Sequence, residues 1–279
     1  MKIIDVSVHQ GVIDWAKVKN SGVDMVIIKA TQGHSIVQHT DAFTDSRFTY
    51  NIRSAIDNRI PVGVYHFYTG RTKEDAIAEA DYFCKVIAPY KDKIVFAFCD
   101  AENYNNEYLL GLSREELTSR INQFCARVAS HGYRAGHYTN IDHINRFINI
   151  GAIKYPVWVA KYSSVKPNVP NMLMWQYTSS GRVPGINTNV DMNEGFFDIN
   201  DYVTYLKKDT LKVGDKVKVA KFYKILGQKR AHLYGNKGSF RVTHDEYEIY
   251  QINSKTGRTV ISYGDVIIAA VDADILEKI

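Results

Sequence analysis

The sequence predicts an α/β protein in two parts: an irregular (β/α) barrel of eight strands and about five helices over residues 1–206, and a small all-β barrel over residues 211–279. Three observations support this fold class. Short apolar runs alternate with helical patterns through the first part, which is the order of a parallel sheet covered by helices. Eight such runs match the strand number of a closed barrel. Beyond residue 207, short strand patterns are separated by turn residues.

The eight predicted strands are runs of four to seven mostly apolar residues. They lie at residues 2–6, 25–30, 61–67, 94–100, 134–138, 156–160, 173–176 and 188–191. Helical spacing of apolar residues lies between the early runs, and two of these patterns begin with capping boxes, Thr72-x-x-Asp75 and Ser113-x-x-Glu116. Only about a dozen residues separate the last three strands, near the minimum for a crossover, so we expect an irregular barrel on that side.

The composition is that of an ordinary globular protein, with 45% hydrophobic and 23% charged residues. No apolar stretch approaches the length of about 20 residues that spans a bilayer. The three cysteines, Cys84, Cys99 and Cys125, are odd in number and lack metal-ligand spacing. We therefore expect buried free thiols, no disulfide, no metal site and no cofactor.

The net charge of +5 is unevenly distributed along the chain. Residues 1–206 carry 21 Lys and Arg against 21 Asp and Glu, whereas residues 207–279 carry 14 against 9. A basic second part indicates an anionic partner, which could be a nucleic acid, a membrane surface or a cell-wall polymer. An ordinary solvated surface is the alternative.

The segment Asp100-Ala101-Glu102 follows the apolar run at residues 94–99. Residues two apart on a strand share a face, so both carboxylates are expected to project together. Neighbouring carboxylates oppose each other's ionisation, and one then holds a proton near neutral pH. This arrangement suits glycosidic bond cleavage, in which one carboxyl protonates the leaving oxygen and another stabilises the anomeric centre. A strand end that runs into a polar loop is the alternative.

Carboxylates and aromatic residues follow most of the predicted strands. The active site of a (β/α) barrel is built at the C-terminal strand ends. The residues at those ends include Asp5, Tyr65, His66, Asp100, Glu102, Tyr138, Trp158, Trp175 and Asp191. We expect Tyr138 and Trp175 to contact a bound sugar, and Trp158 to pack mainly in the core. We expect His66 to satisfy backbone groups beneath the site, because two carboxylates already cover acid–base work.

Several motifs stand in the order found in glycoside hydrolase family 25, the lysozymes that include many phage endolysins. They are Asp5-Val6-Ser7, Ile28-Lys29-Ala30-Thr31-Gln32-Gly33, Gly63-Val64-Tyr65-His66-Phe67, Asp100-Ala101-Glu102, Trp158-Val159-Ala160-Lys161-Tyr162 and Met174-Trp175-Gln176-Tyr177 leading to Asp191. The resemblance covers residues 1 to about 205. It implies an incomplete (β/α) barrel that hydrolyses the β-1,4 bond after N-acetylmuramic acid in peptidoglycan. It also implies that Glu102 is the general acid, that Asp100 acts at the anomeric centre or the acetamido group, and that Asp5 and Asp191 complete an acidic cluster.

The chain departs from the family pattern at Gln32, where Glu is usual. We expect Gln32 to contact substrate or to position other groups, with activity retained. Lys29 is expected either to pair with the acidic cluster or to be an inert strand lysine. Direct attack by Asp100 requires the two carboxyls about 5–5.5 Å apart. Substrate-assisted attack by the sugar's own acetamide is the favoured alternative.

Residues 211–279 resemble the bacterial SH3-like barrels attached to cell-wall hydrolases, on Val213-Gly214-Asp215-Lys216-Val217, the turn spacing and the size. The resemblance implies anchoring to peptidoglycan or another cell-wall polymer. A nucleic-acid partner is disfavoured because aromatic and basic residues are scattered. The candidate contact residues are Tyr223, Tyr234, Tyr247, Tyr250 and Tyr263.

The function that these observations favour is an endolysin-type muramidase that lyses its host cell. The sequence has no apolar h-region near Met1, so we expect no signal peptide. The protein is then expected to accumulate in the host bacterial cytoplasm and to reach the wall after the membrane is permeabilised. A bacterial autolysin, a non-catalytic wall-binding protein, and a chitinase or endo-glucosaminidase are the alternatives.

Overall fold

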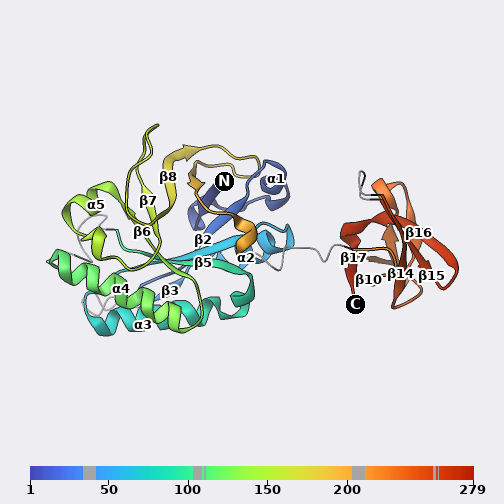
Figure 1. Cartoon of the computed structure of the whole chain (residues 1–279), viewed down its shortest axis with the longest axis horizontal. Helices are drawn as coiled ribbons and strands as arrows, with labels where there is room; N and C mark the ends of the chain where they lie inside the picture. The colour runs from blue at the N-terminus through green and yellow to red at the C-terminus, as the bar shows by residue number, and fades with distance from the viewer. Residues whose placement is uncertain (34–41, 103–108, 110, 203–210, 254–255, 257) are drawn as a thin grey trace. The chain divides into compact units, whose positions relative to one another are not determined.

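The computed structural model describes all residues except 34–41, 103–108, 110, 203–210, 254–255 and 257 (Figure 1). The chain divides into two compact units, Met1–Leu206 and Lys207–Ile279. Residues 207–210, which lie between the two predicted parts, are outside the described residues. Among the described residues, no helix is both long and apolar enough to cross a bilayer.

The first unit is a closed barrel built on one nine-stranded sheet (Figure 1). Its strands are β1 (Lys2–Val6), β2 (Met25–Gln32), β3 (Phe43–Thr44), β4 (Val62–Phe67), β5 (Ile94–Asp100), β6 (Ala135–Asn140), β7 (Val157–Ala160), β8 (Met172–Gly181) and β9 (Val190–Gly195). They are ordered β1-β9-β8-β7-β6-β5-β4-β2-β3, and β1 also pairs with β2. The eight-stranded barrel predicted from the sequence is confirmed, and the two-residue strand β3 is added at its margin.

The barrel is irregular where β9 joins it. β9 runs antiparallel to both β1 and β8, while the other neighbours in the closed ring are parallel. The link from β8 to β9 is too short for a crossover, so the chain turns back as a hairpin. The prediction that Asp191 ends a strand over residues 188–191 is therefore wrong, because Asp191 is the second residue of β9. An antiparallel strand begins at the rim where its parallel neighbours end, and Asp191 reaches that rim all the same.

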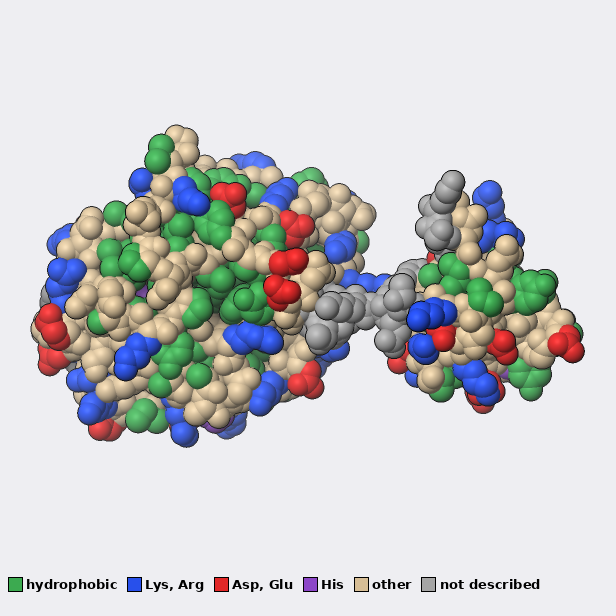
Figure 2. Space-filling view, viewed as in Figure 1, with side chains coloured by type: hydrophobic (Ala, Val, Ile, Leu, Met, Phe, Trp, Pro, Cys, Tyr) green, Lys and Arg blue, Asp and Glu red, His purple; other side chains and the backbone are tan. Residues whose placement is uncertain are grey.

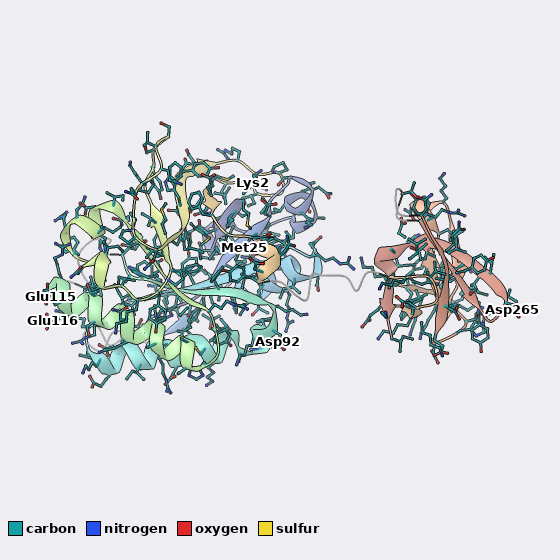
Figure 3. All side chains as sticks on the ribbon, viewed as in Figure 1. Lys2, Met25, Asp92, Glu115, Glu116 and Asp265 are labelled. Carbon is teal, nitrogen blue, oxygen red and sulfur yellow. The ribbon has the colours of Figure 1, made fainter. Side chains whose placement is uncertain are left out.

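Five α-helices are described in this unit. They are α1 (Trp15–Asn20), α2 (Phe48–Asp57), α3 (Lys73–Ile87), α4 (Arg114–Ser130) and α5 (Ile141–Arg146). Both predicted capping boxes form, at Thr72 before α3 and at Ser113 before α4. Glu115 and Glu116 lie in the first turn of α4 (Figure 3), where their negative charges interact favourably with the positive end of the helix dipole. Helices α3 and α4 lie side by side against the outside of the sheet (Figure 1).

Strand alternation separates two apolar cores in the barrel unit. Met25 points into the barrel (Figure 3), where it belongs to a cluster with Phe98 and Trp158, while the other core lies between the sheet and the helices. The Trp158 ring lies 5.4 Å from that of Phe98 and 4.4 Å from that of Tyr138, measured between centroids. These rings fill the barrel interior and form a floor beneath the polar rim. All three cysteines are free and buried, as predicted.

The described residues of the second unit form eight short strands around a separate apolar core. They are β10 (Lys216–Val219), β11 (Tyr223–Ile225), β12 (Gln228–His232), β13 (Ser239–Arg241), β14 (Tyr247–Ile252), β15 (Arg258–Tyr263), β16 (Val266–Asp272) and β17 (Leu276–Lys278). They form an antiparallel sheet β16-β15-β14-β10-β17 and a smaller sheet β11-β12-β13. The all-β character agrees with the sequence, in which strand patterns lie at residues 213–220, 240–243, 246–252, 258–262 and 266–270. β11, β12 and β17 lie outside these predicted ranges. The SH3-like resemblance stays a prediction.

Tyr247 is not available as a ligand contact in this unit. Its side chain is 2% exposed, and its hydroxyl accepts hydrogen bonds from the backbone N–H groups of Thr243 and His244. Tyr247 closes a turn at the edge of the core, which corrects its inclusion among the candidate contacts. Tyr250 and Tyr263 are exposed on neighbouring strands.

Candidate active site

Four carboxyl groups gather at one rim of the barrel. Asp5 on β1 lies directly opposite Asp191 on β9 in the strand register. Asp100 ends β5 on the same face as the interior residue Phe98, and Glu102 follows two residues later. The charge of Asp191 raises the pKa of both Asp5 and Glu102, and the charge of Glu102 raises the pKa of Asp100. The structure therefore brings the four predicted carboxyls together.

Asp5 is held by two side-chain amides. The Nε2 group of Gln176 donates to Asp5 Oδ2 over 3.0 Å, and the Nδ2 group of Asn193 donates to the same oxygen over 2.8 Å. The indole N–H of Trp158 donates to Asn193 Oδ1 over 2.7 Å. Because an indole nitrogen can only donate, this bond fixes which end of the Asn193 amide faces Asp5.

The Gln176 amide is oriented in the same way by two tyrosines. The hydroxyls of Tyr138 and Tyr162 donate to Gln176 Oε1 over 3.0 and 3.2 Å. Gln176 and Asn193 were not among the predicted site residues. Period-two alternation could have found them, since Gln176 follows the interior residue Met174 and Asn193 follows Asp191, each two positions along its strand.

The four carboxyls differ in their affinity for protons. Burial, with the charge of Asp191, raises the pKa of Asp5 to about 8, although the bonds from Asn193 and Gln176 act against this. Burial raises the pKa of Glu102 to about 7 and that of Asp191 to about 6. Burial also raises the pKa of Asp100 well above its usual range. Near pH 7, Asp5 thus holds a proton, Asp191 is mostly ionised, and Glu102 lies close to its midpoint.

Asp100 has an unsatisfied oxygen. It is 5% exposed, and its Oδ1 atom has no hydrogen-bond partner within the described part of the chain. Buried polar atoms in folded proteins nearly always have a partner, so an exception at a rim of carboxyls indicates a group that meets substrate.

Lys29 joins the cluster from β2. Its Nζ donates to Gln32 Oε1 over 2.9 Å and lies 5.0 Å from the centroid of the Phe67 ring. Burial lowers the pKa of Lys29, while the charges of Asp100 and Glu102 among others raise it, and Lys29 in return lowers the pKa of both carboxyls. The charge of Lys29 and those of the two acids therefore act on one another, as expected if Lys29 pairs with the acidic cluster. Its Gln32 partner is neutral and leaves its charge uncancelled.

The aromatic residues separate into two groups. Tyr65 packs edge-on against Trp158 with centroids 6.3 Å apart, and the charges of Asp5 and Asp100 add to burial in raising the pKa of Tyr65. Tyr138 lies in the same interior cluster. Trp175 alternates with Gln176 and points to the outer face, where its indole N–H donates to the Lys161 carbonyl over 2.8 Å. Trp175 is therefore not brought to the acidic cluster.

His66 has the structural role that was expected, but with different partners. It is fully buried between the sheet and helix α3. Its Nδ1 lies 2.6 Å from Thr31 Oγ1 and its Nε2 lies 2.7 Å from Glu79 Oε2. The backbone and hydroxyl of Thr69 donate to the same Glu79 carboxylate. His66 thus binds side chains of β2 and α3 rather than the backbone groups that were predicted.

The chemistry available at this rim is proton transfer and charge stabilisation by carboxyls. One acid near its midpoint at pH 7 can both donate and accept a proton in a catalytic cycle. In the parts of the chain that the structure describes, no group of three or more His, Cys, Asp or Glu side chains is arranged to hold a metal ion.

Comparisons with known proteins identify the barrel. The family model described as glycosyl hydrolases family 25 matches residues 4–186. Lysozyme M1 of Streptomyces globisporus is 33% identical over 202 residues, which cover 68% of this chain and 66% of that protein. The autolytic lysozyme of Clostridium acetobutylicum is 29% identical over 195 residues, which cover 70% and 55%. The chain thus spans less than two thirds of the length of these curated relatives.

Solved structures agree with this assignment. The bacterial lysozyme of Streptomyces coelicolor is 30% identical with a TM-score of 0.64, over 73% of this chain and 95% of that one. The CTP1L endolysin is 26% identical with a TM-score of 0.60, over 74% and 69%. Asp5, Asp100 and Glu102 lie within residues 4–186, which the family model matches, and Asp191 lies five residues beyond them. On the match over residues 4–186, the chain belongs to glycosyl hydrolase family 25.

Proposed function

We propose that the barrel is a muramidase that hydrolyses the β-1,4 bond between N-acetylmuramic acid and N-acetylglucosamine in peptidoglycan. The observation that carries this proposal is the pairing of Glu102, whose pKa is about 7, with Asp100, whose buried Oδ1 has no partner among the described residues. The first group can protonate a leaving oxygen at neutral pH, and the second has an oxygen that could accept a hydrogen bond from the sugar. Relatives named lysozyme support the choice of substrate.

In the proposed reaction, Glu102 gives its proton to the glycosidic oxygen as the bond to the anomeric carbon breaks. The acetamido oxygen of the sugar attacks that carbon, and Asp100 accepts a hydrogen bond from the acetamido N–H. Burial raises the pKa of Asp100, and the ammonium of Lys29 acts against this by favouring the ionised carboxylate. Water, deprotonated by Glu102, then opens the cyclic intermediate and regenerates the acid.

Asp5 and Asp191 support this pair. They face each other across β1 and β9 and hold one proton between them near pH 7, given pKa values of about 8 and about 6. This lowers the negative charge around Glu102 and leaves Asp191 ionised to stabilise positive charge at the anomeric centre. The amides of Asn193 and Gln176 keep Asp5 in place while charge moves.

The proposal extends to the biological setting. An endolysin that lyses the host of a bacteriophage would accumulate in the cytoplasm and reach the wall after the membrane is permeabilised. The likeness to the CTP1L endolysin supports this role, and the autolytic lysozyme of Clostridium acetobutylicum supports a bacterial autolysin as the second candidate. The second unit, with its surplus of basic residues, is proposed to be an SH3-like module that holds the enzyme on a cell-wall polymer.

The decisive experiment compares the wild-type protein with Glu102→Gln on purified Gram-positive cell walls, with identification of the new reducing ends. Asp92→Asn is the matched control, because Asp92 is an exposed acid in the 3-10 helix Ala88–Lys93, just before the opposite end of β5 (Figure 3). We expect muramic acid ends from the wild type and from Asp92→Asn, and a loss of at least about a hundredfold in Glu102→Gln.

Other outcomes select the alternatives. Glucosamine ends would indicate an endo-glucosaminidase, and a wild-type protein that binds walls without cleaving them would indicate a wall-binding protein. A covalent glycosyl adduct on Asp100, detected by mass spectrometry after an acid quench, would show that Asp100 attacks the anomeric carbon directly and that the mechanism is not substrate-assisted.

A further inference from the structure

The hairpin that joins β11 to β12 has an unusual turn. Ile225 pairs with Gln228, so Leu226 and Gly227 form a two-residue turn, with φ angles of +49° and +77°. Turns with two positive φ angles favour Asn-Gly, because a branched apolar side chain is strained in the left-handed region. Leu226 is also 97% exposed. Neither the turn nor the core of the unit gives a reason for leucine at this position, and strain of this kind points to a function.

Two lysines next to the turn also destabilise the hairpin. Lys224 and Lys229 lie directly opposite each other in the β11–β12 register, where like charges repel. Neither ammonium has a carboxylate partner among the described residues. The Nζ atom of Lys229 instead lies 5.0 Å from the centroid of the Phe222 ring.

The sequence around this hairpin contains no acidic residue. Between Asp215 and Asp245 the chain carries eight Lys and Arg residues and no Asp or Glu. The lysines of β10 pair with Glu246 and Glu277, which come from outside this stretch. The hairpin at residues 223–232 therefore keeps its positive charge.

Apolar side chains are exposed next to the tip and at the base of the hairpin. Ile225 is 50% exposed, and Phe222, just before β11, is 42% exposed. On the face of this unit seen in Figure 2, hydrophobic and basic side chains lie next to one another at the surface. An apolar tip with ammonium groups behind it matches the boundary of an anionic bilayer, where apolar side chains enter the headgroup region and lysines contact phosphates.

We propose that the β11–β12 hairpin binds the surface of an anionic phospholipid bilayer, with Leu226 inserted among the headgroups and Lys224 and Lys229 over the phosphates. A polyanionic wall polymer would use the lysines but gives no reason for an exposed leucine in a strained turn. A neutral glycan would use neither. This binding uses no part of the acidic cluster, so it goes beyond the muramidase activity and stands independently of it.

The test measures sedimentation of the full chain with vesicles of phosphatidylglycerol and with vesicles of phosphatidylcholine. We expect binding to the first to exceed binding to the second by at least about tenfold at low salt, and to weaken as salt rises. Leu226→Asn should lower binding to phosphatidylglycerol vesicles about tenfold, because the apolar side chain is lost. The same variant should raise the melting temperature, because Asn tolerates a positive φ.

A control and a second variant separate lipid binding from general stickiness. Ile267→Asn removes an apolar side chain of 56% exposure from β16 in the same unit and should leave vesicle binding unchanged. Lys224→Gln combined with Lys229→Gln should lower binding and reduce its salt dependence.

Three results would overturn the proposal. The first is no preference for phosphatidylglycerol vesicles, and the second is unchanged binding by Leu226→Asn at a raised melting temperature. The third is equal retention of wild type and Leu226→Asn on immobilised polyphosphate, with both proteins bound more weakly to vesicles than to polyphosphate. That result would identify a polyanion as the partner. Wall hydrolysis is not a readout here, so failure of this proposal is distinguishable from failure of the muramidase proposal.

Discussion

Lys29 acts against burial in setting the pKa of Glu102. The ammonium favours the ionised carboxylate and so lowers the pKa of Glu102 from the value that burial alone would produce. Removing it in Lys29→Met should raise that pKa, so Glu102 stays protonated to higher pH. We expect the alkaline limb of the kcat/KM profile, which lies near pH 7 in the wild type, to move to higher pH in the variant.

Gln32→Glu tests the same electrostatic argument without removing the lysine. Gln32 accepts a hydrogen bond from Lys29 Nζ, so Glu at this position would pair with the ammonium and cancel part of its field. The alkaline limb should move in the same direction as in Lys29→Met. A limb that stays in place or moves to lower pH in both variants would contradict the role of Lys29.

Asp5 makes the folded state less stable at neutral pH. Its pKa is about 8 in the folded protein against 3.8 ordinarily, so the folded state binds a proton that the unfolded state has released between these values. Stability therefore falls as the pH rises from about 4 to about 8. Asp5→Asn removes the titration, while its side-chain oxygen can still accept from Asn193 and Gln176.

Urea unfolding of wild type and Asp5→Asn at several pH values measures this effect. We expect the two to have similar unfolding free energies near pH 4, and the variant to be more stable by about 1–3 kcal/mol at pH 8. A variant that is less stable at pH 8 would show that the carboxylate, rather than the carboxylic acid, is favoured in the folded state.

Helix α3 is attached to the sheet by a buried polar network rather than by apolar contacts alone. Glu79 receives hydrogen bonds from Thr69, its Oε2 lies 2.7 Å from His66 Nε2, and both side chains are fully buried. A Cβ atom at Gly33 would collide with the Glu79 carboxylate, so the end of β2 approaches α3 very closely. The network thus lies directly against Gly33, at the end of β2.

Glu79→Gln should destabilise the protein by about 2–4 kcal/mol, because it leaves buried partners of a charged group incompletely satisfied. Glu74→Gln, on the exposed first turn of the same helix, should cost less than about 0.5 kcal/mol. Chemical denaturation at pH 7 compares the two. Equal, small losses would show that α3 is held by its apolar face alone.

The strands and helices of the barrel were predictable because their patterns are local. Strand alternation and capping boxes depend on residues a few positions apart, and both capping boxes form as expected. The direction of β9 was not predicted, because it depends on the length of a connection and on which neighbour is free to pair. The same limit applies to Trp175, whose strand was identified but whose face is decided by its neighbour Gln176.

At the scale of the whole molecule, the two units have separate apolar cores. We expect calorimetry of the full chain to show two unfolding transitions, and a fragment of residues 1–206 to reproduce one of them within a few degrees. The fragment should hydrolyse solubilised peptidoglycan at the rate of the full chain but clear intact walls more slowly, since it lacks the proposed anchor. A fragment that fails to fold would show that the units stabilise each other.

The sequence by itself determined the barrel, its eight strands, the four carboxyls and the free thiols, because each follows from local periodicity or from motifs in a fixed order. Only the tertiary structure decided the partners. It placed the amides of Asn193 and Gln176 on Asp5, brought the Lys29 ammonium near enough to lower the pKa of Asp100 and of Glu102, and turned Trp175 away from the rim. These features depend on contacts between strands far apart in sequence, and on the burial that raises each carboxyl's pKa, neither of which a local pattern records.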